Sequence, residues 1–221
     1  MLHPVSSDPN ISRLQGYTID LYKEIEETSG ATYAFAKAAK VHGAQYFTHC
    51  GVTETKQRSD GSWDVTTPKG MINAGIIVNC GGLWARELGH MQGINLPVQP
   101  MEHHYLITEA IPEIVERADK GLGRLPCGID YEANIYFRQE RQGMLLDIYE
   151  PKGTPWKVGG TPWEFGHELL QPDLDRIADQ LELGFERIPS LANAGIKDAI
   201  NGPFTFGPDG NPMIGPDTDA D

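Results

Sequence analysis

The sequence predicts a mixed α/β (α+β) fold, and three stretches indicate it. Residues 75–79 form an apolar, β-branched run of strand length that ends near two glycines, Gly81 and Gly82, and a helix-like pattern follows at once. After Val98, short strand-like runs alternate with loops rich in proline and glycine, which is typical of an antiparallel sheet. Residues 172–188 place their apolar side chains on one face of a helix, with acidic residues in the first turn. The chain of 221 residues therefore combines a strand–turn–helix unit with an antiparallel sheet.

The elements of the first half follow from their spacing and their stop signals. Residues 12–27 have apolar groups close to helical spacing and predict an amphipathic helix. The alanine-rich run 31–42 predicts a second helix, which stops at Gly43. Asp60-Gly61 is a hairpin signal between two of the strands expected next. The expected strands are 45–49, 52–57, 62–67 and 76–79.

The second half predicts an antiparallel sheet followed by one helix and a loop. Strands are expected at 104–108, 134–139 and 144–149. The helix spans 172–188, and the tail after Asn201 is expected to be a loop because it is rich in glycine, proline and aspartate.

The composition limits the size of the domains and the kinds of partner that the protein can have. Hydrophobic residues make up 39% of the chain, which fits one large domain or two small ones with a core. Eighteen basic and 31 acidic residues give a formal net charge of −13, which argues against nucleic acid and anionic membranes as partners. Because no apolar run approaches the length of a membrane span, we expect none.

Cysteine and histidine spacing argues against disulfides and metal. Cys50, Cys80 and Cys127 show no CxxC spacing, which predicts a reducing compartment. His103 and His104 are adjacent, but no His-x-x-x-His motif and no carboxylate cluster at zinc spacing accompanies this pair. We therefore expect no metal site.

Residues 75–89 resemble the late Rossmann strand of the FAD-dependent amine oxidoreductases of the D-amino-acid-oxidase superfamily, in the dimethylglycine and sarcosine dehydrogenase branch. Taken alone, the two glycines favour an ordinary tight connection between a strand and a helix. Other segments resemble the same family in the same order along the chain. These segments are 58–68, 101–109, 135–140 and 201–216.

The resemblance implies a division of the chain and a cofactor. Residues 1–97 would be part of an FAD-binding, Rossmann-type domain, and residues 98–200 a substrate domain built on the antiparallel sheet. Residues 201–221 would return toward the FAD domain. FAD is the implied cofactor, and tetrahydrofolate would serve in longer relatives.

Some motifs of the family are missing from these residues. No Gly-x-Gly-x-x-Gly turn for the FAD pyrophosphate occurs, and neither does a Trp-His-Ala-Ala-Gly-like motif for covalent flavin attachment. By comparison with the family, we expect a deletion at the Gly30-Ala31 junction and an end before the family's glycine-rich C-terminal segment. We therefore expect a fragment that is inactive on its own.

His103 and Tyr105 are the expected catalytic residues. They lie two positions apart on a predicted strand, so both face one side of the sheet while His104 faces the other. By resemblance, the first side lines the substrate cavity: His103 would orient the substrate or influence protonation of its amine, and Tyr105 would donate to its carboxylate. Without the resemblance, a hydrogen-bonded histidine in the sheet and a core tyrosine are the favoured explanation of these two residues.

Four further positions are carried over as flavin contacts. Val52 would offer backbone contacts on the adenine side, and Gly81, Gly82 and Trp84 would lie at the strand-to-helix turn. Trp84 equally fits a core anchor at the start of its helix.

Two charged residues bear on the substrate. Arg138 offers a guanidinium fork for a substrate carboxylate, but its position in the sequence favours surface pairing with Glu140 or Asp130 over that role. Asp147 stands where the family usually has glycine, so its carboxylate would crowd or charge the cavity.

The resemblance implies oxidative demethylation of dimethylglycine, sarcosine or a related N-methyl amino acid, with electrons passed from reduced flavin to an acceptor. The location would be the cytoplasm in a bacterium or the mitochondrial matrix in a eukaryote. The alternative is a non-catalytic relative that serves as a regulatory or interaction subunit, like the regulatory subunit of pyruvate dehydrogenase phosphatase.

Overall fold

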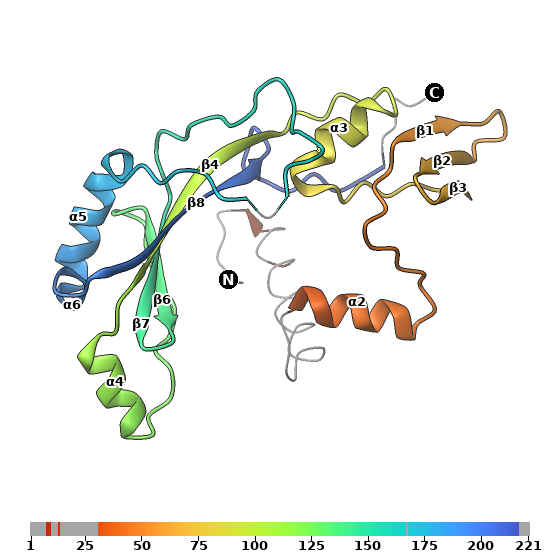
Figure 1. Ribbon diagram of the computed structural model, residues 1–221. Helices are drawn as coiled ribbons and strands as arrows, with labels where there is room; N and C mark the ends of the chain where they lie inside the picture. The colour runs from red at the N-terminus through yellow and green to blue at the C-terminus, as the bar shows by residue number, and fades with distance from the viewer. Residues whose placement is uncertain (1–7, 10–12, 14–30, 167, 217–221) are drawn as a thin grey trace. The chain divides into compact units, whose positions relative to one another are not determined.

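The computed structural model describes residues 8, 9, 13, 31–166 and 168–216 (Figure 1). Contacts between Cα atoms divide the chain into two compact units, Met1–Ile77 and Val78–Asp221, and each unit is described by itself. The helix expected over 12–27 lies, apart from Arg13, outside the described residues. The domain boundaries expected at 97 and 200 stay predictions.

The first unit contains one helix and a three-stranded antiparallel sheet of order β1-β2-β3. Its elements are α2 (Ala31–Val41), β1 (Glu54–Gln57), β2 (Trp63–Thr67) and β3 (Gly70–Ala74). The predicted hairpin is confirmed: Gly61 has φ +82°, and Asp60 accepts hydrogen bonds from the backbone and hydroxyl of Ser62. The sequence missed β3, which a second tight turn at Gly70, with φ +123°, connects to β2.

Two predicted strands of the first half are wrong. Residues 45–49 and 76–79 have irregular backbone, and Ile76 and Val78 are 80% and 77% exposed. A strand needs a neighbour to pair its backbone groups, and no described strand of this chain pairs with either segment. The apolar run at 76–79 therefore predicted a strand, but none of the described strands pairs with it.

The second unit is built on a five-stranded antiparallel sheet of order β5-β6-β7-β4-β8. The strands predicted at 104–108, 134–139 and 144–149 are confirmed as β4, β6 and β7, although β4 begins earlier than predicted, at Gln99, and the sequence missed β5. The strands are β4 (Gln99–Thr108), β5 (Gly128–Asp130), β6 (Ile135–Glu140), β7 (Gly143–Ile148) and β8 (Ile196–Phe206).

β8 corrects the expectation that a loop begins at Asn201. Residues 201–206 continue the strand because they pair with β4, from Asn201 opposite His104 to Phe206 opposite Gln99. Pro203 is tolerated there because β8 lies at the edge of the sheet, where a missing N–H breaks no second ladder. Beyond Phe206, residues 207–216 are irregular as predicted.

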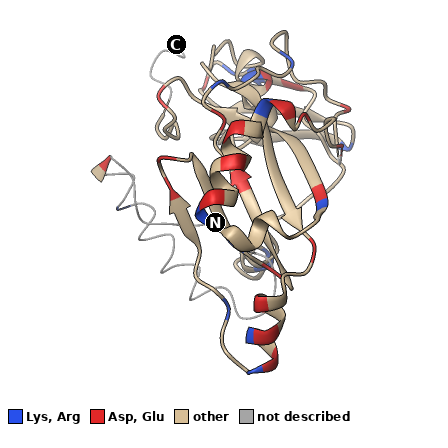
Figure 2. Cartoon of the chain, turned by 90° about the vertical axis from the view of Figure 1, so that its left-hand side faces the viewer, with Lys and Arg blue, Asp and Glu red and all other residues tan. Residues whose placement is uncertain are grey.

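Helices cover one face of this sheet (Figure 1). The predicted helix at 172–188 is confirmed as a 3-10 turn followed by α5, and Gly184 lets α5 approach β7 because a Cβ there would lie 3.2 Å from Leu146. The core under the helices includes Leu106, Ile135 and Leu181. Acidic residues colour α4 and α5 red in Figure 2. The helices are η1 (Gly82–Trp84), α3 (Ala85–His90), α4 (Pro112–Asp119), η2 (Asp175–Ile177), α5 (Ala178–Arg187) and α6 (Pro189–Ala192).

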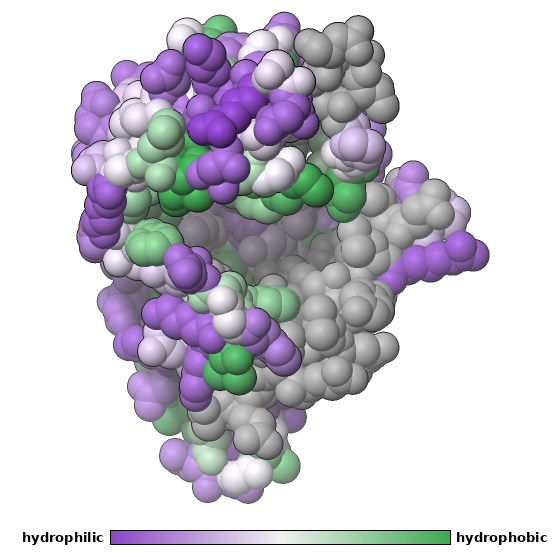
Figure 3. Space-filling view, turned by 90° about the vertical axis from the view of Figure 1, so that its right-hand side faces the viewer, coloured by the Kyte–Doolittle hydropathy of each residue, from purple (hydrophilic) through white to green (hydrophobic). Residues whose placement is uncertain are grey.

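Large apolar side chains are also exposed in both units. On the face shown in Figure 3, green hydrophobic residues interrupt the hydrophilic ones. Val41 and Met71 are 77% and 64% exposed in the first unit, and Ile214 is 77% exposed in the second.

Candidate functional site

The predicted catalytic residues lie on the face of the second unit's sheet that is opposite to the face packed against α5. In the strand register, Tyr105 of β4 is opposite Asp147 of β7, and Asp147 is opposite Tyr136 of β6. His103 lies two residues before Tyr105 and therefore shares its side of the strand. We call His103, Tyr105, Tyr136 and Asp147 the His103 face. The predicted placement of His103 and Tyr105 on one side is confirmed.

Asp147 is the buried charge of the His103 face. Its side chain is 5% exposed, and its Oδ1 lies 2.9 Å from Nε2 of His103. The contact is not aligned as a hydrogen bond, and Oδ1 has no other partner in the described part of the chain. Burial, and then the charge of Asp147 and a hydrogen bond with it, raise the pKa of Tyr136, so this phenol stays protonated. Burial and the charge of Asp147 also raise the pKa of Tyr149.

His103 lines a cavity of about 440 Å³. Aromatic rings surround the imidazole: Phe204 and Tyr149 lie with ring centroids 5.5 and 6.1 Å from it. Opposite His103, Gly202 leaves the backbone bare, because a Cβ there would meet nothing within 4 Å. Other residues that line the cavity include Met101, Glu102, Glu150 and Phe206.

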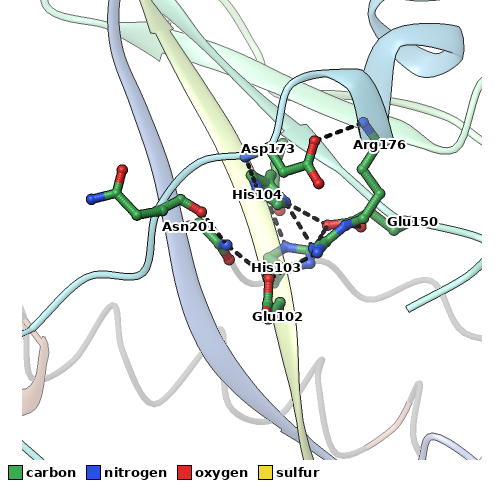
Figure 4. A network of polar contacts seen from close by, with 9 residues as sticks. Glu102, His103, His104, Glu150, Asp173, Arg176 and Asn201 are labelled. Carbon is green, nitrogen blue, oxygen red and sulfur yellow. Dashed lines mark hydrogen bonds and ion pairs between the residues drawn. The ribbon is translucent and has the colours of Figure 1, made fainter. Parts of the chain in front are cut away.

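His104 faces the helices, as alternation along the strand predicts, and lies in a buried polar network (Figure 4). Its Nε2 accepts the backbone N–H of Asp173 at 3.0 Å, so the ring proton must lie on Nδ1, which is 2.7 Å from Oε1 of Glu150. A longer contact of 3.3 Å joins Nδ1 to Nη2 of Arg176. The shorter contact with a carboxylate decides the tautomer, and His104 is the Nδ1–H form.

Arg176 joins the two carboxylates of this network. Its Nε lies 2.7 Å from Oε2 of Glu150, and its Nη1 lies 2.8 Å from Oε2 of Glu102. Asn201 donates to the same oxygen of Glu102 at 2.9 Å. Burial alone would raise the pKa of Glu102, but the hydrogen bonds from Asn201 and Arg176 outweigh it and lower that pKa. For Arg176, burial opposes the charge, yet Glu150 and Glu102 raise its pKa.

Sequence reasoning missed the partners of His104. A histidine on the core face of a strand must be hydrogen-bonded, so the pattern itself signals a buried polar network. The partners were not identifiable, because Glu150 lies 46 residues from His104 along the chain and Arg176 lies 72 residues away.

The turn at 79–84 is held by its own side chains. Asn79 accepts the N–H of Gly81 at 3.1 Å and donates to the carbonyl oxygen of Ala85 at 2.9 Å. A Cβ on Gly81 would lie 2.5 Å from Cδ1 of Leu88, so this glycine lets the turn pack on its helix. Gly82 has φ +55° and open space around it.

Trp84 and Val52 take less specific positions. Trp84 donates from Nε1 to the carbonyl oxygen of Pro162 at 2.9 Å, which supports its role as an anchor. Val52 lies in the other unit, just before β1. As flavin contacts, Val52, Gly81, Gly82 and Trp84 stay predictions.

Asn79→Ala is expected to lower the free energy of unfolding by about 1 kcal/mol, because the turn loses two hydrogen bonds that water replaces only in part. Urea unfolding of the two chains measures the difference. Asn193→Ala, at an exposed residue, is the matched control and should change stability by less than about 0.5 kcal/mol. Equal effects of both substitutions would show that Asn79 does not hold the turn.

Arg138 forms an ion pair with Glu140, the surface pairing named as the alternative to substrate binding. Its side chain is 35% exposed, and it shares the strand face of Tyr136. A role for Arg138 in binding substrate stays a prediction.

Within the described residues, no group of three or more histidine, cysteine or acidic side chains is arranged to hold a metal ion. In the same part of the chain, no helix is both long enough and apolar enough to cross a membrane. Cys50, Cys80 and Cys127 are all free thiols.

Comparison with known proteins defines the class to which this fold and this site belong. The chain belongs to the family of FAD dependent oxidoreductases, whose family model matches residues 22–220. It is 44% identical over 191 residues to mitochondrial dimethylglycine dehydrogenase of Mus musculus, covering 84% of this chain and 21% of that protein. Mitochondrial sarcosine dehydrogenase of Mus musculus is 30% identical over 194 residues, covering 86% of this chain and 20% of the relative. The chain therefore spans about a fifth of the length of these curated relatives.

A solved structure shares the fold. L-proline dehydrogenase from P. horikoshii superposes with a TM-score of 0.65 and 27% sequence identity, covering 84% of this chain and 46% of that one. The predicted family and fold class are confirmed.

The residues of the His103 face are chemically compatible with the ring of a flavin. The space at Gly202 is open, and the rings of Phe204 and Tyr149 lie near the imidazole of His103. The N–H groups of a histidine and the phenols beside it are suitable donors to ring or substrate oxygens.

Proposed function

We propose that the chain is part of an FAD-dependent enzyme that oxidatively demethylates dimethylglycine, sarcosine or a related N-methyl amino acid. The observation that carries the proposal is the sheet face with His103 and Tyr105 side by side, in a chain 44% identical to a dimethylglycine dehydrogenase. FAD, when bound, would accept the hydride from the N-methyl carbon.

The residues of the chain would bind and orient the substrate. Tyr105 would donate a hydrogen bond to the substrate carboxylate, and Arg138 would add a charge-assisted one. His103 would accept a proton from the substrate amine, because only a neutral amine has the lone pair that makes hydride loss favourable. Gly81, Gly82, Trp84 and Val52 would contact the flavin. Electrons would pass to an acceptor outside this chain, and tetrahydrofolate would take the one-carbon unit in longer relatives.

The 221-residue chain on its own should hold no FAD, because it contains no Gly-x-Gly-x-x-Gly turn to bind the pyrophosphate. After incubation with FAD and gel filtration, we expect a protein without flavin absorbance. Retained flavin that bleaches on addition of dimethylglycine would contradict this expectation and would itself demonstrate the activity.

A chimera tests the function of the site directly. Residues 78–216 replace the aligned segment of mouse dimethylglycine dehydrogenase, and the flavin spectrum is followed after adding dimethylglycine or sarcosine. We expect bleaching, slowed about a hundredfold by His103→Gln. If the chain is instead a non-catalytic regulatory or interaction subunit, the flavin bound to the chimera will not bleach when either substrate is added.

A further inference from the structure

The cavity beside His103 is lined by a part of β4 that does not pair with β7. Pairing of these two strands begins at His104, which lies opposite Ile148. Before that point a loop lies along the same edge of β4, and the N–H of Glu102 donates to the carbonyl oxygen of Thr154 at 2.8 Å. Glu102 and His103 point to opposite sides of the strand, yet both line the cavity. The cavity therefore meets both sides of β4.

Among the described residues, only one oxygen of the Glu102 carboxylate has hydrogen-bond donors (Figure 4). Its Oε2 accepts from Nη1 of Arg176 at 2.8 Å and from Nδ2 of Asn201 at 2.9 Å. No hydrogen bond from the described part of the chain reaches Oε1, and this oxygen is not one of the buried atoms that lack a partner. Burial opposes ionisation, but the same two donors outweigh it and lower the pKa of Glu102, so the carboxylate is ionised at neutral pH. Oε1 is therefore an accessible, charged oxygen on a side chain that lines the cavity.

The polar network around Glu102 has a surplus of negative charge. Glu102 and Glu150 are two carboxylates, and Arg176 is the one guanidinium that pairs with both. His104 adds no charge, because its Nε2 accepts the N–H of Asp173 and so holds no proton. Both oxygens of Glu150 have partners, Oε1 with His104 and Oε2 with Arg176, and the side chain is 4% exposed. The surplus charge can therefore meet a ligand at Oε1 of Glu102.

The rest of the cavity wall fits the methyl groups of a cation. Tyr149 and Phe206 contribute aromatic rings, and Met101 contributes a flexible thioether. Aromatic faces attract cations, and proteins use them to bind methylated ammonium groups. No lysine or arginine is among the described residues that line the cavity, so an anionic ligand would find no such partner there.

We propose that Glu102 is a specificity-determining residue of the cavity: its Oε1 binds the charged nitrogen of a methylated ammonium. Arg176 and Asn201 are positioning residues, because they hold Oε2 and leave Oε1 to the ligand. The inference deepens the proposed function and rests on it for the identity of the natural substrate, an N-methyl amino acid. Glu102 then selects molecules with a positive charge over neutral molecules of the same shape.

A methyl NMR titration of the free chain tests the proposal without flavin. Methionine methyl groups are labelled with 13C, and Met101 is the reporter because it lines the cavity; Met101→Leu assigns its signal by loss. The probes are tetramethylammonium and tert-butanol, which has a similar shape but no charge. At about pH 8, where an ordinary histidine is neutral, we expect tetramethylammonium to shift the Met101 signal and to bind about tenfold more tightly than tert-butanol, or better.

Glu102→Gln keeps an oxygen that can accept from Arg176 and Asn201 but removes the charge. It should raise the dissociation constant of tetramethylammonium about tenfold and change that of tert-butanol by less than about twofold. A purely structural role of Glu102 would weaken the binding of both probes alike. Glu109→Gln is the matched control, because Glu109 is an exposed carboxylate just after β4 that does not line the cavity. It should change neither constant by more than about twofold.

A wild-type Met101 signal that ignores tetramethylammonium, or that reports equal affinity for the two probes, overturns the proposal. So does Glu102→Gln if it leaves the affinity for tetramethylammonium unchanged or weakens both probes equally, and so does Glu109→Gln if it has the same effect as Glu102→Gln. The wild-type comparison of the two probes decides even if Glu102→Gln does not fold. The chimera tests the proposed function separately: bleaching by a chimera whose segment ignores tetramethylammonium would keep that function and reject the role of Glu102.

Discussion

Arg176→Met is expected to lower the free energy of unfolding by about 3 kcal/mol at neutral pH, because it leaves two carboxylates in the interior without a counter-charge. Glu150 is 4% exposed and Glu102 is 21% exposed, and both contact the guanidinium below 3 Å. The loss lies at the lower end of the range for a broken buried pair because a fifth of the Arg176 side chain reaches solvent.

The loss should depend on pH with a defined sign. The folded chain lowers the pKa of Glu102 below its unfolded value, so this carboxylate stabilises the fold above the unfolded pKa, and the contribution disappears as pH falls through the folded pKa. Arg176 is one cause of the lowered pKa. Wild type and Arg176→Met should therefore differ most at neutral pH and converge in acid.

Urea unfolding at neutral and acid pH measures both quantities. Lys197→Met, which removes an exposed cation of β8, is the control and should change stability by less than about 0.5 kcal/mol. A difference between wild type and Arg176→Met that does not shrink in acid would mean that lost packing, not charge, causes the destabilisation.

Leu146→Ala should cost about 3 kcal/mol, because it opens a cavity at the centre of the core. Leu146 is 1% exposed on β7 and lies where α5 comes closest to the sheet at Gly184. The rigid strand and the helix backbone limit how far the structure can close the space.

Leu169→Ala is the same chemical change at a leucine that is 65% exposed, and it should cost less than about 0.5 kcal/mol. Thermal or urea unfolding of the three chains gives the comparison. Similar effects at both positions would show that the sheet and α5 do not share a tightly packed core.

The sequence predicted elements whose own pattern defines them. Short strand-like runs between loops rich in proline and glycine identified β6 and β7, and helical periodicity identified α5. Pattern failed where pairing decides the structure. Residues 76–79 look like a buried strand but have no described neighbour, and residues 201–206 look like a loop but pair with β4.

In the candidate site, too, the pattern of one strand was predictable, whereas contacts between strands were not. Alternation on β4 placed His103 and Tyr105 together and His104 opposite, and this needed no knowledge of the fold. The contact of His103 with Asp147 joins two strands, β4 and β7. The register of these strands depends on the chain between them and on the packing of the core, so the sequence of one segment does not predict the contact.

The double histidine of β4 makes the local sequence ambiguous about register. If β4 slipped by one residue in either direction, one of the two histidine positions would still hold a histidine, so the pair alone penalises such an error weakly. The flanking residues must carry the discrimination: a slip would turn Leu106, which is 2% exposed, out of the core. Burial of Leu106, which does not line the cavity, therefore helps to fix the register that brings the site residues together. A substitution that loosens the core at Leu106 would allow β4 to pair in a shifted register, although every residue of the site would still be present.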